Sequence, residues 1–390
     1  MKINEKRSYL ETIKKRYRKS NRKQKHKILD EFCATTGYNR KYAIYALRKR
    51  KTKHHNKKTG RRSFYAREEF LQPLKILWQQ SDFICSKKLK VILCDWLPFY
   101  ESRHGNLDDI TRGQLRAISP ATIDRILRPL RPDYPCKGRS GTKPGRLLKN
   151  QIPIKTDNWD VTKPGFFEAD TVAHCGTSLS GNFVWSLTMT DILTGWTENR
   201  AIWNKGSAGV VKQVKNIEKN LPFPIYGFDC DNGSEFLNYH LIRYFQKRKK
   251  PVQFTRSRPY HKDDNAHVEQ KNWTHVRQVF GYTRFDKNSL VGLMNDLYSK
   301  EFSLYHNHFI PTMKLVEKIK INSKYRKRYN KPKTPYQRVM ESEDVTGEKK
   351  EALKKQHELL NPFELKQVID QKLKRIFSQI NSPVKFTRKK

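Results

Sequence analysis

Three acidic residues occupy positions that suit metal-dependent chemistry: Asp170, Asp231 and Glu269. Asp170 lies inside the apolar segment 166–172, where an ionised carboxylate is costly to bury unless something pairs with it. Asp231 ends the apolar segment 225–231 directly before an Asn-Gly turn, and Glu269 falls in the first turns of a predicted helix. Carboxylates on separate elements suit Mg²⁺, which takes few protein ligands and keeps positions for water and phosphate. Two such ions can serve phosphodiester chemistry, one activating the attacking oxygen and the other stabilising the leaving oxygen.

The elements that must position these acids alternate in type along the central part of the chain. Alternating and β-branched residues predict strands at 166–172, 183–192, 196–203, 225–231 and 252–255. Helical periodicity predicts helices at 207–221, 240–247, 264–280 and 289–306. Three hairpin strands followed by alternating helices and strands indicate an α/β domain, a mixed sheet flanked by helices.

The charge of the chain points to a polyanionic partner. Among 390 residues, 81 are Lys or Arg and 38 are Asp or Glu, which gives a net charge of +43. We expect no membrane partner, because no apolar run approaches the ~20 residues of a spanning helix. The charge is also uneven: residues 1–62 hold 23 basic and 4 acidic residues, whereas residues 159–310 hold 19 and 15. A basic DNA-gripping module in front of a nearly neutral catalytic block would give this distribution.

Residues 28–50 fit a helix-turn-helix. Apolar residues recur at helical spacing up to the turn at Gly37, and Asn39 can cap a second helix. The polar face of that second helix is basic and supplies candidate DNA contacts, namely Arg40, Lys41, Arg48, Lys49 and Arg50. An ordinary helical hairpin with a solvated charged face is the alternative.

A second candidate of the same kind follows a stretch, 66–104, that is predicted to be helical throughout. Residues 110–115 lead into a helix with Ser119 at its N-cap and Pro120 at its first position. Arg116, Arg125 and Arg128 flank that helix and are candidate DNA contacts. A small all-helical bundle is the competing interpretation.

Two further segments complete the predicted organisation. Residues 132–158 are rich in Pro, Gly and basic residues and are typical of a linker. Residues 313–338 interleave tyrosines with Lys and Arg, which suits either nucleic-acid contact or a disordered linker, and 344–377 predict one or two amphipathic helices. The expected domains are therefore 1–62 and 63–131, both all-α, the linker 132–158, the core 159–310, and a basic and helical tail 311–390. The six cysteines form no Cys-x-x-Cys pair, which argues against structural zinc.

The acids and their neighbours resemble the DDE integrase core of insertion-sequence transposases and retroviral integrases. The similarity lies in Asp170, then Asp231-Asn232-Gly233-Ser234-Glu235-Phe236, then Asp264-Asn265-Ala266-His267-Val268-Glu269. It implies an RNase H-like fold and two Mg²⁺ or Mn²⁺ ions held by Asp170, Asp231 and Glu269. It also implies a homo-oligomer assembled on double-stranded transposon ends, and a bacterial, cytoplasmic, nucleoid-associated protein.

The chain departs from that family pattern in three places. Asp229 lies on the same strand face as Asp231, and Asp231 is preferred because the motif places its acid directly before Asn-Gly. A slightly long gap before Glu269 predicts an extra turn near 247–251. The helix face that carries Glu269 lacks the basic residues that often follow it in this family. Contact with the DNA end is therefore assigned to residues that lie mostly upstream of Glu269, namely Arg256, Arg258, His261, Lys262 and Lys271.

The function expected from these features is transposase or integrase activity, that is, metal-dependent cleavage of DNA ends followed by strand transfer of a mobile element. One alternative is a non-catalytic, sequence-specific DNA-binding protein, a domesticated transposase. The presence of Asp170, Asp231 and Glu269 argues against a loss of catalytic activity. The other is an RNase H-like structure-specific nuclease, and the paired helix-turn-helix candidates favour an end-reading enzyme over it.

Overall fold

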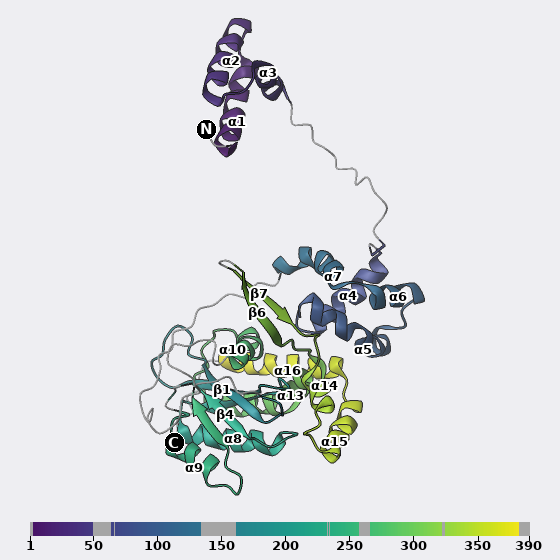
Figure 1. Ribbon diagram of the computed structural model, residues 1–390, viewed down its shortest axis with the longest axis vertical. Helices are drawn as coiled ribbons and strands as arrows, with labels where there is room; N and C mark the ends of the chain where they lie inside the picture. The colour runs from purple at the N-terminus through teal and green to yellow at the C-terminus, as the bar shows by residue number, and fades with distance from the viewer. Residues whose placement is uncertain are drawn as a thin grey trace, which may run out of the picture. The chain divides into compact units, whose positions relative to one another are not determined.

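The computed structural model describes residues 3–49, 64–65, 67–133, 161–231, 233, 235–256, 266–321 and 324–381. The chain divides into two compact units, 1–63 and 64–390 (Figure 1). In the part of the chain that the structure covers, no helix is long and apolar enough to cross a membrane.

The N-terminal unit is a small cluster of helices. They are α1 (Ile3–Lys19), α2 (Arg22–Thr36) and α3 (Arg40–Arg48). Gly37 adopts a left-handed backbone (φ 69°) that ends α2, and the Asn39 side chain accepts a hydrogen bond from the Lys41 amide at 2.9 Å to begin α3. The core of the unit is formed by Ile13, Tyr17, Ile28, Leu29, Phe32, Ala43 and Leu47. The predicted helix, glycine turn and basic helix are therefore present, with α1 packed against both.

The second unit begins with a helical region. It contains α4 (Glu68–Gln80), α5 (Ser86–His104), α6 (Asp109–Ala117), α7 (Pro120–Leu127) and the 3₁₀ segment η1 (Arg128–Asp133). The expected continuous helix over 66–104 is broken between α4 and α5, where Asp82 and Phe83 have left-handed φ values of 55° and 57°. As predicted, the Ser119 side chain accepts from the Thr122 amide and Pro120 occupies the first position of α7.

All five predicted strands form one mixed sheet. They are β1 (Phe166–Ala173), β2 (Val184–Asp191), β3 (Thr197–Trp203), β4 (Gly227–Cys230) and β5 (Gln253–Arg256). The strand order is β3-β2-β1-β4-β5; β1, β2 and β3 are antiparallel neighbours, whereas β4 is parallel to β1 and β5 is parallel to β4. The predicted α/β architecture, a mixed sheet flanked by helices, is confirmed.

Helices cover both faces of the sheet. One face packs against α8 (Ser207–Asn220) and α9 (Tyr239–Gln246). The other packs against a long helix made of α10 (Ala266–Lys271), the π-helical η3 (Asn272–Arg277) and α11 (Gln278–Phe280), and against α12 (Ser289–Leu297), the π-helical η4 (Tyr298–Phe302) and α13 (Ser303–Phe309). Residues 247–250, where an extra turn is predicted, form a run of bends between α9 and β5.

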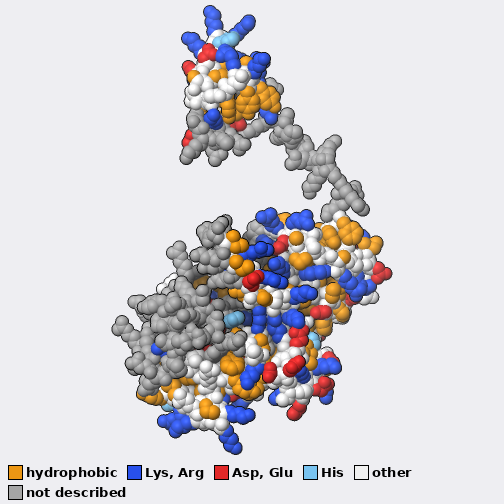
Figure 2. Space-filling view, viewed as in Figure 1, with side chains coloured by type: hydrophobic (Ala, Val, Ile, Leu, Met, Phe, Trp, Pro, Cys, Tyr) orange, Lys and Arg blue, Asp and Glu red, His pale blue; other side chains and the backbone are white. Residues whose placement is uncertain are grey.

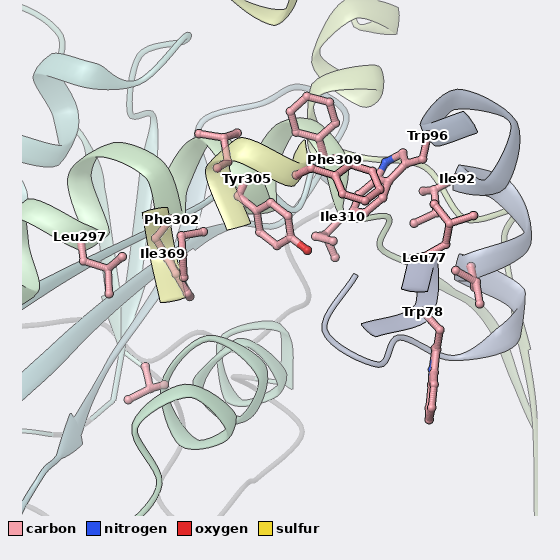
Figure 3. Packing of buried hydrophobic residues seen from close by; sticks show 14 of the residues in the cluster. Leu77, Trp78, Ile92, Trp96, Leu297, Phe302, Tyr305, Phe309, Ile310 and Ile369 are labelled. Atoms are coloured by element: carbon pink, nitrogen blue, oxygen red, sulfur yellow. The ribbon is translucent and has the colours of Figure 1, made fainter. Parts of the chain in front are cut away.

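The helical region α4–α7 shares a hydrophobic core with the helices over the second face of the sheet. Trp96 of α5 lies 6.3 Å from Tyr305 and 6.4 Å from Phe309 of α13, measured between ring centroids. Figure 3 shows these aromatic side chains beside Ile92 and Leu77. Segments expected as separate domains, 63–131 and 159–310, are thus joined by one continuous core.

The C-terminal region contains a hairpin and helices, so the disordered-linker alternative for 313–338 is wrong, and nucleic-acid contact stays a prediction. It forms a hairpin of β6 (Leu315–Ile321) and β7 (Lys324–Tyr329), followed by α14 (Pro335–Glu341), α15 (Gly347–Glu358) and α16 (Pro362–Asn381). The basic and tyrosine-rich segment alternates along β7, so its pattern is that of a strand. The region 344–377, predicted to hold one or two helices, holds α15 and most of α16, and α16 contributes Phe363, Leu365, Ile369 and Ile376 to the core of the second unit.

Gly165 fixes the entry to β1 and provides a stability test. Its φ is 112°, and a Cβ placed there would lie 2.4 Å from the Pro224 carbonyl oxygen. We expect Gly165→Ala to lower the free energy of unfolding by about 2 kcal/mol or more, because backbone strain and a clash with backbone combine. Urea unfolding measures the change.

The matched control is Gly292→Ala in α12, where a Cβ meets nothing within 4 Å. That variant should be neutral or stabilised by about 0.5–1 kcal/mol, as for any glycine in a helix interior. Equal effects of the two substitutions would contradict the role assigned to Gly165.

Candidate active site

Asp170 and Asp231 come from neighbouring strands. The parallel pairing of β1 with β4 places Ala169 opposite Cys230, so the next residue on each side is one of the two acids. Ala169 and Cys230 point into the core beneath α8 and α9. Because side chains alternate along a strand, Asp170 projects from the other face, toward α10 and η3.

The two carboxylates lie in an acidic environment that opposes their ionisation. Burial raises the pKa of Asp170 well above its usual value, and the negative charge of Asp231 raises it further. Burial, followed by the charge of Glu235, raises the pKa of Asp231 to about 6, although the Gly233 amide donates a hydrogen bond to it at 2.8 Å. Lys205 opposes both shifts. The site is a cluster of acids with an excess of negative charge.

Glu235 is the third member of this cluster and was not selected from the sequence. It is only 1% exposed; its Oε1 accepts from the Thr171 hydroxyl at 2.7 Å and pairs with Lys205 Nζ at 2.8 Å. Its Oε2 is buried without a hydrogen-bond partner among the described residues. The carboxylate folds back over Gly233, where a Cβ would lie 2.4 Å from Oε2. A side chain at position 233 would displace this carboxylate.

Glu168 joins the helix that carries Glu269 to the strand that carries Asp170. Its Oε2 accepts hydrogen bonds from the amides of His267 and Val268, each at 3.0 Å. These amides belong to the first turn of α10, where N–H groups have no partner within the helix. Since Glu168 and Asp170 lie two residues apart on one strand face, the start of α10 is held beside Asp170.

A second contact fixes the orientation of the same helix. Asn272 Nδ2 donates to Asp170 Oδ2 at 2.6 Å. Glu269 lies three residues before Asn272, so the two share a helix face, and that face is turned toward Asp170. The Glu269 side chain is exposed. In the residues that the structure describes, no group of three or more His, Cys, Asp or Glu side chains is close enough to hold a metal ion. The structure therefore brings Asp170 and Asp231 together and leaves Glu269 on the adjacent helix.

The structure gives Asp229 and Asp231 different surroundings. Asp229 is fully buried within β4 and accepts from the Thr255 hydroxyl at 2.6 Å, whereas Asp231 lies just past the end of the strand. The Asp229 carboxylate is thus engaged in a hydrogen bond with the neighbouring strand β5. Two positioning residues could have been found from spacing alone: Glu168 is two residues before Asp170 on a strand, and Asn272 is three residues after Glu269 on a helix.

The basic residues proposed near the acids are mostly buried or lie outside the described residues. Lys271 is 8% exposed and Arg256 is 6% exposed, so neither offers a charged group on the surface as expected for a DNA contact. Burial, with the nearby charges of Lys88 and Arg338, lowers the pKa of Lys271 to about 7. Arg258, His261 and Lys262 fall in 257–265, outside the part that the structure describes.

The basic face predicted for the N-terminal unit is exposed. Arg40, Lys41, Arg48 and Lys49 are all exposed at or next to α3, and Arg50 lies outside the described residues. Arg40 forms an ion pair with Asp30 of α2. Tyr42 and Tyr45, 52% and 58% exposed, stand among these cations, and Lys49 lies over the Tyr45 ring. Figure 2 shows Lys and Arg side chains projecting from this unit. Such a surface suits contact with a phosphate backbone.

The second set of candidate DNA contacts is also at the surface. Arg116 at the end of α6, Arg125 on α7 and Arg128 at the start of η1 are all exposed. The Arg125 guanidinium donates to the Thr122 hydroxyl at 3.0 Å, which orients it along α7. None of the three is committed to an acid in the described part of the chain by an observed ion pair.

Replacing Asp231 by Asn tests whether the ionised Asp231 carboxylate destabilises the folded protein. A folded-state pKa raised to about 6 means that the folded protein binds this proton more tightly, so stability falls as pH rises from about 4 to 6. Asp231→Asn removes that penalty, and we expect it to raise the free energy of unfolding by about 1–3 kcal/mol at pH 7. The gain should largely vanish at pH 4. Denaturant unfolding at the two pH values measures the change in the free energy of unfolding. A variant less stable than the wild type at pH 7 would contradict the view that the ionised Asp231 carboxylate destabilises the folded protein.

Removing the Glu168 carboxylate should loosen the start of α10. We expect Glu168→Ala to speed amide hydrogen exchange in residues 266–272 by about five- to tenfold, the equivalent of a lost helix cap. Mass spectrometry of the exchanging peptides is the measurement. Glu348→Ala, an exposed glutamate in the first turn of α15, is the control and should leave 266–272 unchanged. Unaltered exchange in the Glu168 variant would show that the cap is unimportant.

Comparison with known proteins gives one clear relationship. No protein-family model matches the chain. The chain is 39% identical over 336 residues to the uncharacterized protein y4rM of Sinorhizobium fredii, in an alignment that covers 84% of this chain and 93% of that protein. The identity and its extent over both chains show that this protein belongs to the same family as y4rM.

Proposed function

We propose that this protein is a DDE-type polynucleotidyl transferase, a transposase or integrase that cleaves the ends of a mobile DNA element and joins them to target DNA. One observation carries the proposal. Asp170 and Asp231, which have 60 residues between them in the sequence, are brought together by the pairing of β1 with β4, and Glu168 attaches the helix of Glu269 to β1. The order of the three acids and of their elements is the one that the resemblance to DDE integrase cores implies.

The sheet supports an RNase H-like core as part of this proposal. Three antiparallel strands are followed by two parallel ones; Asp170 lies on the central strand β1, and Asp231 directly follows the neighbouring strand β4. Helices cover both faces of the sheet, so a site at the end of β4 is framed by the Asp231–Phe236 turn and by α10.

The acidic cluster fits a divalent cation. Asp170 and Asp231 have raised pKa values from burial and neighbouring negative charge, and Oε2 of Glu235 is buried without a hydrogen-bond partner in the part of the chain that the structure describes. The ligands that these acids offer are carboxylate oxygens, which Mg²⁺ and Mn²⁺ accept. Asp170, Asp231 and Glu269 would hold two ions. When bound, such ions activate the attacking oxygen and stabilise the leaving oxygen of the phosphodiester.

The residues of the chain have separate tasks in this reaction. Asn272 holds one oxygen of Asp170, Glu168 holds the helix of Glu269, and Lys205 balances part of the negative charge through Glu235. Asp231 carries a proton more often as the pH falls below about 6. Activity should therefore decline at acidic pH, because protonation removes a ligand charge.

The partner in this proposal is double-stranded DNA. The exposed basic and aromatic face of α3 and the arginines beside α7 support reading of the element's ends, and the net charge of +43 supports binding of end and target together. Assembly as a homo-oligomer on the two ends, in the cytoplasm with the nucleoid, is part of the same proposal.

The test is cleavage and strand transfer with duplexes carrying the inverted repeats that flank the gene, in Mg²⁺ or Mn²⁺. We expect Asp231→Asn to lose about 10³-fold or more in cleavage rate, equivalent to ~4 kcal/mol of barrier, while binding the same duplex with unchanged affinity. Glu269→Gln should behave alike. Gel separation of cleaved and joined strands gives the rates, and fluorescence anisotropy gives the affinity.

Asp344→Asn is the matched control, because Asp344 is exposed between α14 and α15 and should keep full activity. Retained cleavage by Asp231→Asn would overturn the assignment of the acids. Binding by the wild type with no cleavage would indicate the domesticated, non-catalytic alternative. Cleavage of junctions or hybrids without strand transfer would indicate the structure-specific nuclease.

A further inference from the structure

A cavity of about 790 Å³ lies at the open edge of the sheet, away from the acids. Its walls come from both faces of the sheet, with α8 and His240 of α9 on one side and α12 and η4 on the other. Arg200 of the edge strand β3 also lines it. Because β3 has no further strand beside it, this groove runs along the strand itself.

Arg200 lies in the groove with part of its hydrogen-bonding capacity unused. The side chain is 1% exposed; Nε donates to Asn216 Oδ1 at 2.8 Å, and Nη1 donates to Glu198 Oε2 at 3.0 Å and to the Asn199 carbonyl at 2.7 Å. A guanidinium has five N–H donors, so both donors of Nη2 remain. Nη2 is buried and has no acceptor among the described residues. An acceptor supplied by a ligand would complete its bonding.

The edge of β3 is closed to strand addition. The side-chain amide of Asn295 makes two hydrogen bonds with the backbone of Ala201: its Oδ1 accepts from the Ala201 N–H at 2.8 Å, and its Nδ2 donates to the Ala201 carbonyl at 2.9 Å. Asn307 does the same at Thr197, with 2.9 Å in each direction. Since the outward N–H and C=O groups at these positions are satisfied, the groove does not recognise an extended peptide by β-pairing. Its side chains must supply the recognition.

Among the charged side chains that line the groove, the cationic ones predominate. Lys212, Lys215 and Lys219 are exposed on one face of α8, at a spacing of three and four residues, and Lys300 of η4 faces the same cavity. The acid that lines the cavity is Asp296, which is paired with Lys300 at 2.6 Å and with Lys372 at 2.7 Å. A run of positive charge above a buried guanidinium matches a chain of phosphates.

We propose that this groove binds the phosphodiester backbone of DNA as a second contact, distinct from the strand end at the acids. Arg200 is in register with Leu187, which is in register with Thr171, so the groove lies two strands, about 10 Å, to the side of the acids. Arg200 contacts Asn216 of α8, whereas Asp170 contacts Asn272 on the opposite face. The groove therefore lies at the edge of the sheet, to the side of the acids, and its contact with DNA is separate from the contacts that the acids make.

This inference rests on the proposed function only in taking DNA as the partner, so it is tested without catalysis. The full chain is acetylated with limiting reagent in EDTA, with and without a short duplex of mixed sequence. We expect DNA to slow acetylation of Lys212, Lys215 and Lys219 by at least about threefold, because phosphates cover them. Lys349, Lys354 and Lys355 on α15 are the comparison and should not change. Equal modification of the α8 lysines with and without DNA overturns the proposal.

Charge reversal gives an independent measurement. Lys212→Glu, Lys215→Glu and Lys219→Glu together should weaken DNA binding by about tenfold or more and make the salt dependence of log K shallower by about 2 to 3. The control combines Lys349→Glu, Lys354→Glu and Lys355→Glu, which changes the net charge equally. Equal losses in both variants would overturn the groove in favour of a general charge effect. A groove effect without metal-dependent cleavage by the wild type would refute the proposed chemistry and keep the groove.

Discussion

The carboxylate of Glu168 receives two backbone amides from the start of α10, and the arrangement of the candidate site depends on that contact. A buried, ionised carboxylate is costly unless hydrogen bonds compensate for its lost hydration, and unpaired amides at a helix start are costly for the same reason. The two amides compensate the carboxylate for its lost hydration, and the carboxylate gives the two amides an acceptor. Because the contact joins residues about 100 positions apart, it sets the distance between Asp170 and the helix of Glu269, which local sequence cannot do.

The acids themselves work against stability. Burial raises the pKa values of Asp170 and Asp231, the negative charges of Asp231 and Glu235 raise that of Asp170 further, and the charge of Glu235 raises that of Asp231; Lys205 neutralises only part of the excess charge. Local features keep the cluster together in spite of this. The Gly233 turn admits the Glu235 carboxylate, and Asn272 holds Asp170. Strain of this kind is expected where a site is organised for a ligand rather than for the folded chain alone.

The two units differ in the size of their hydrophobic cores and in their exposed charge. The N-terminal unit has a small core and an exposed basic, aromatic face, so most of its surface is available to a partner. In the second unit, α4–α7 and α16 are bound into the core beneath the acids' helices. Under the proposed function, the arginines near α7 share a core with the catalytic sheet, and the basic groove at β3 supplies a further contact with DNA. One chain would then hold DNA at three surfaces of different geometry.

The sequence by itself determined the elements and the order of the acids. Strand alternation located all five strands, capping residues located α3 and α7, and charge separated the basic arm from the core. These signals are local, since they depend on neighbours within one or two turns. The hairpin β6–β7 was missed because alternation of Tyr with Lys and Arg also suits a disordered basic segment. Tertiary structure alone decided that Lys271 and Arg256 are buried, that Glu235 joins Asp170 and Asp231, and that Arg200 floors a groove. Burial and pairing across the sheet depend on residues far apart in the chain, and no local pattern records them.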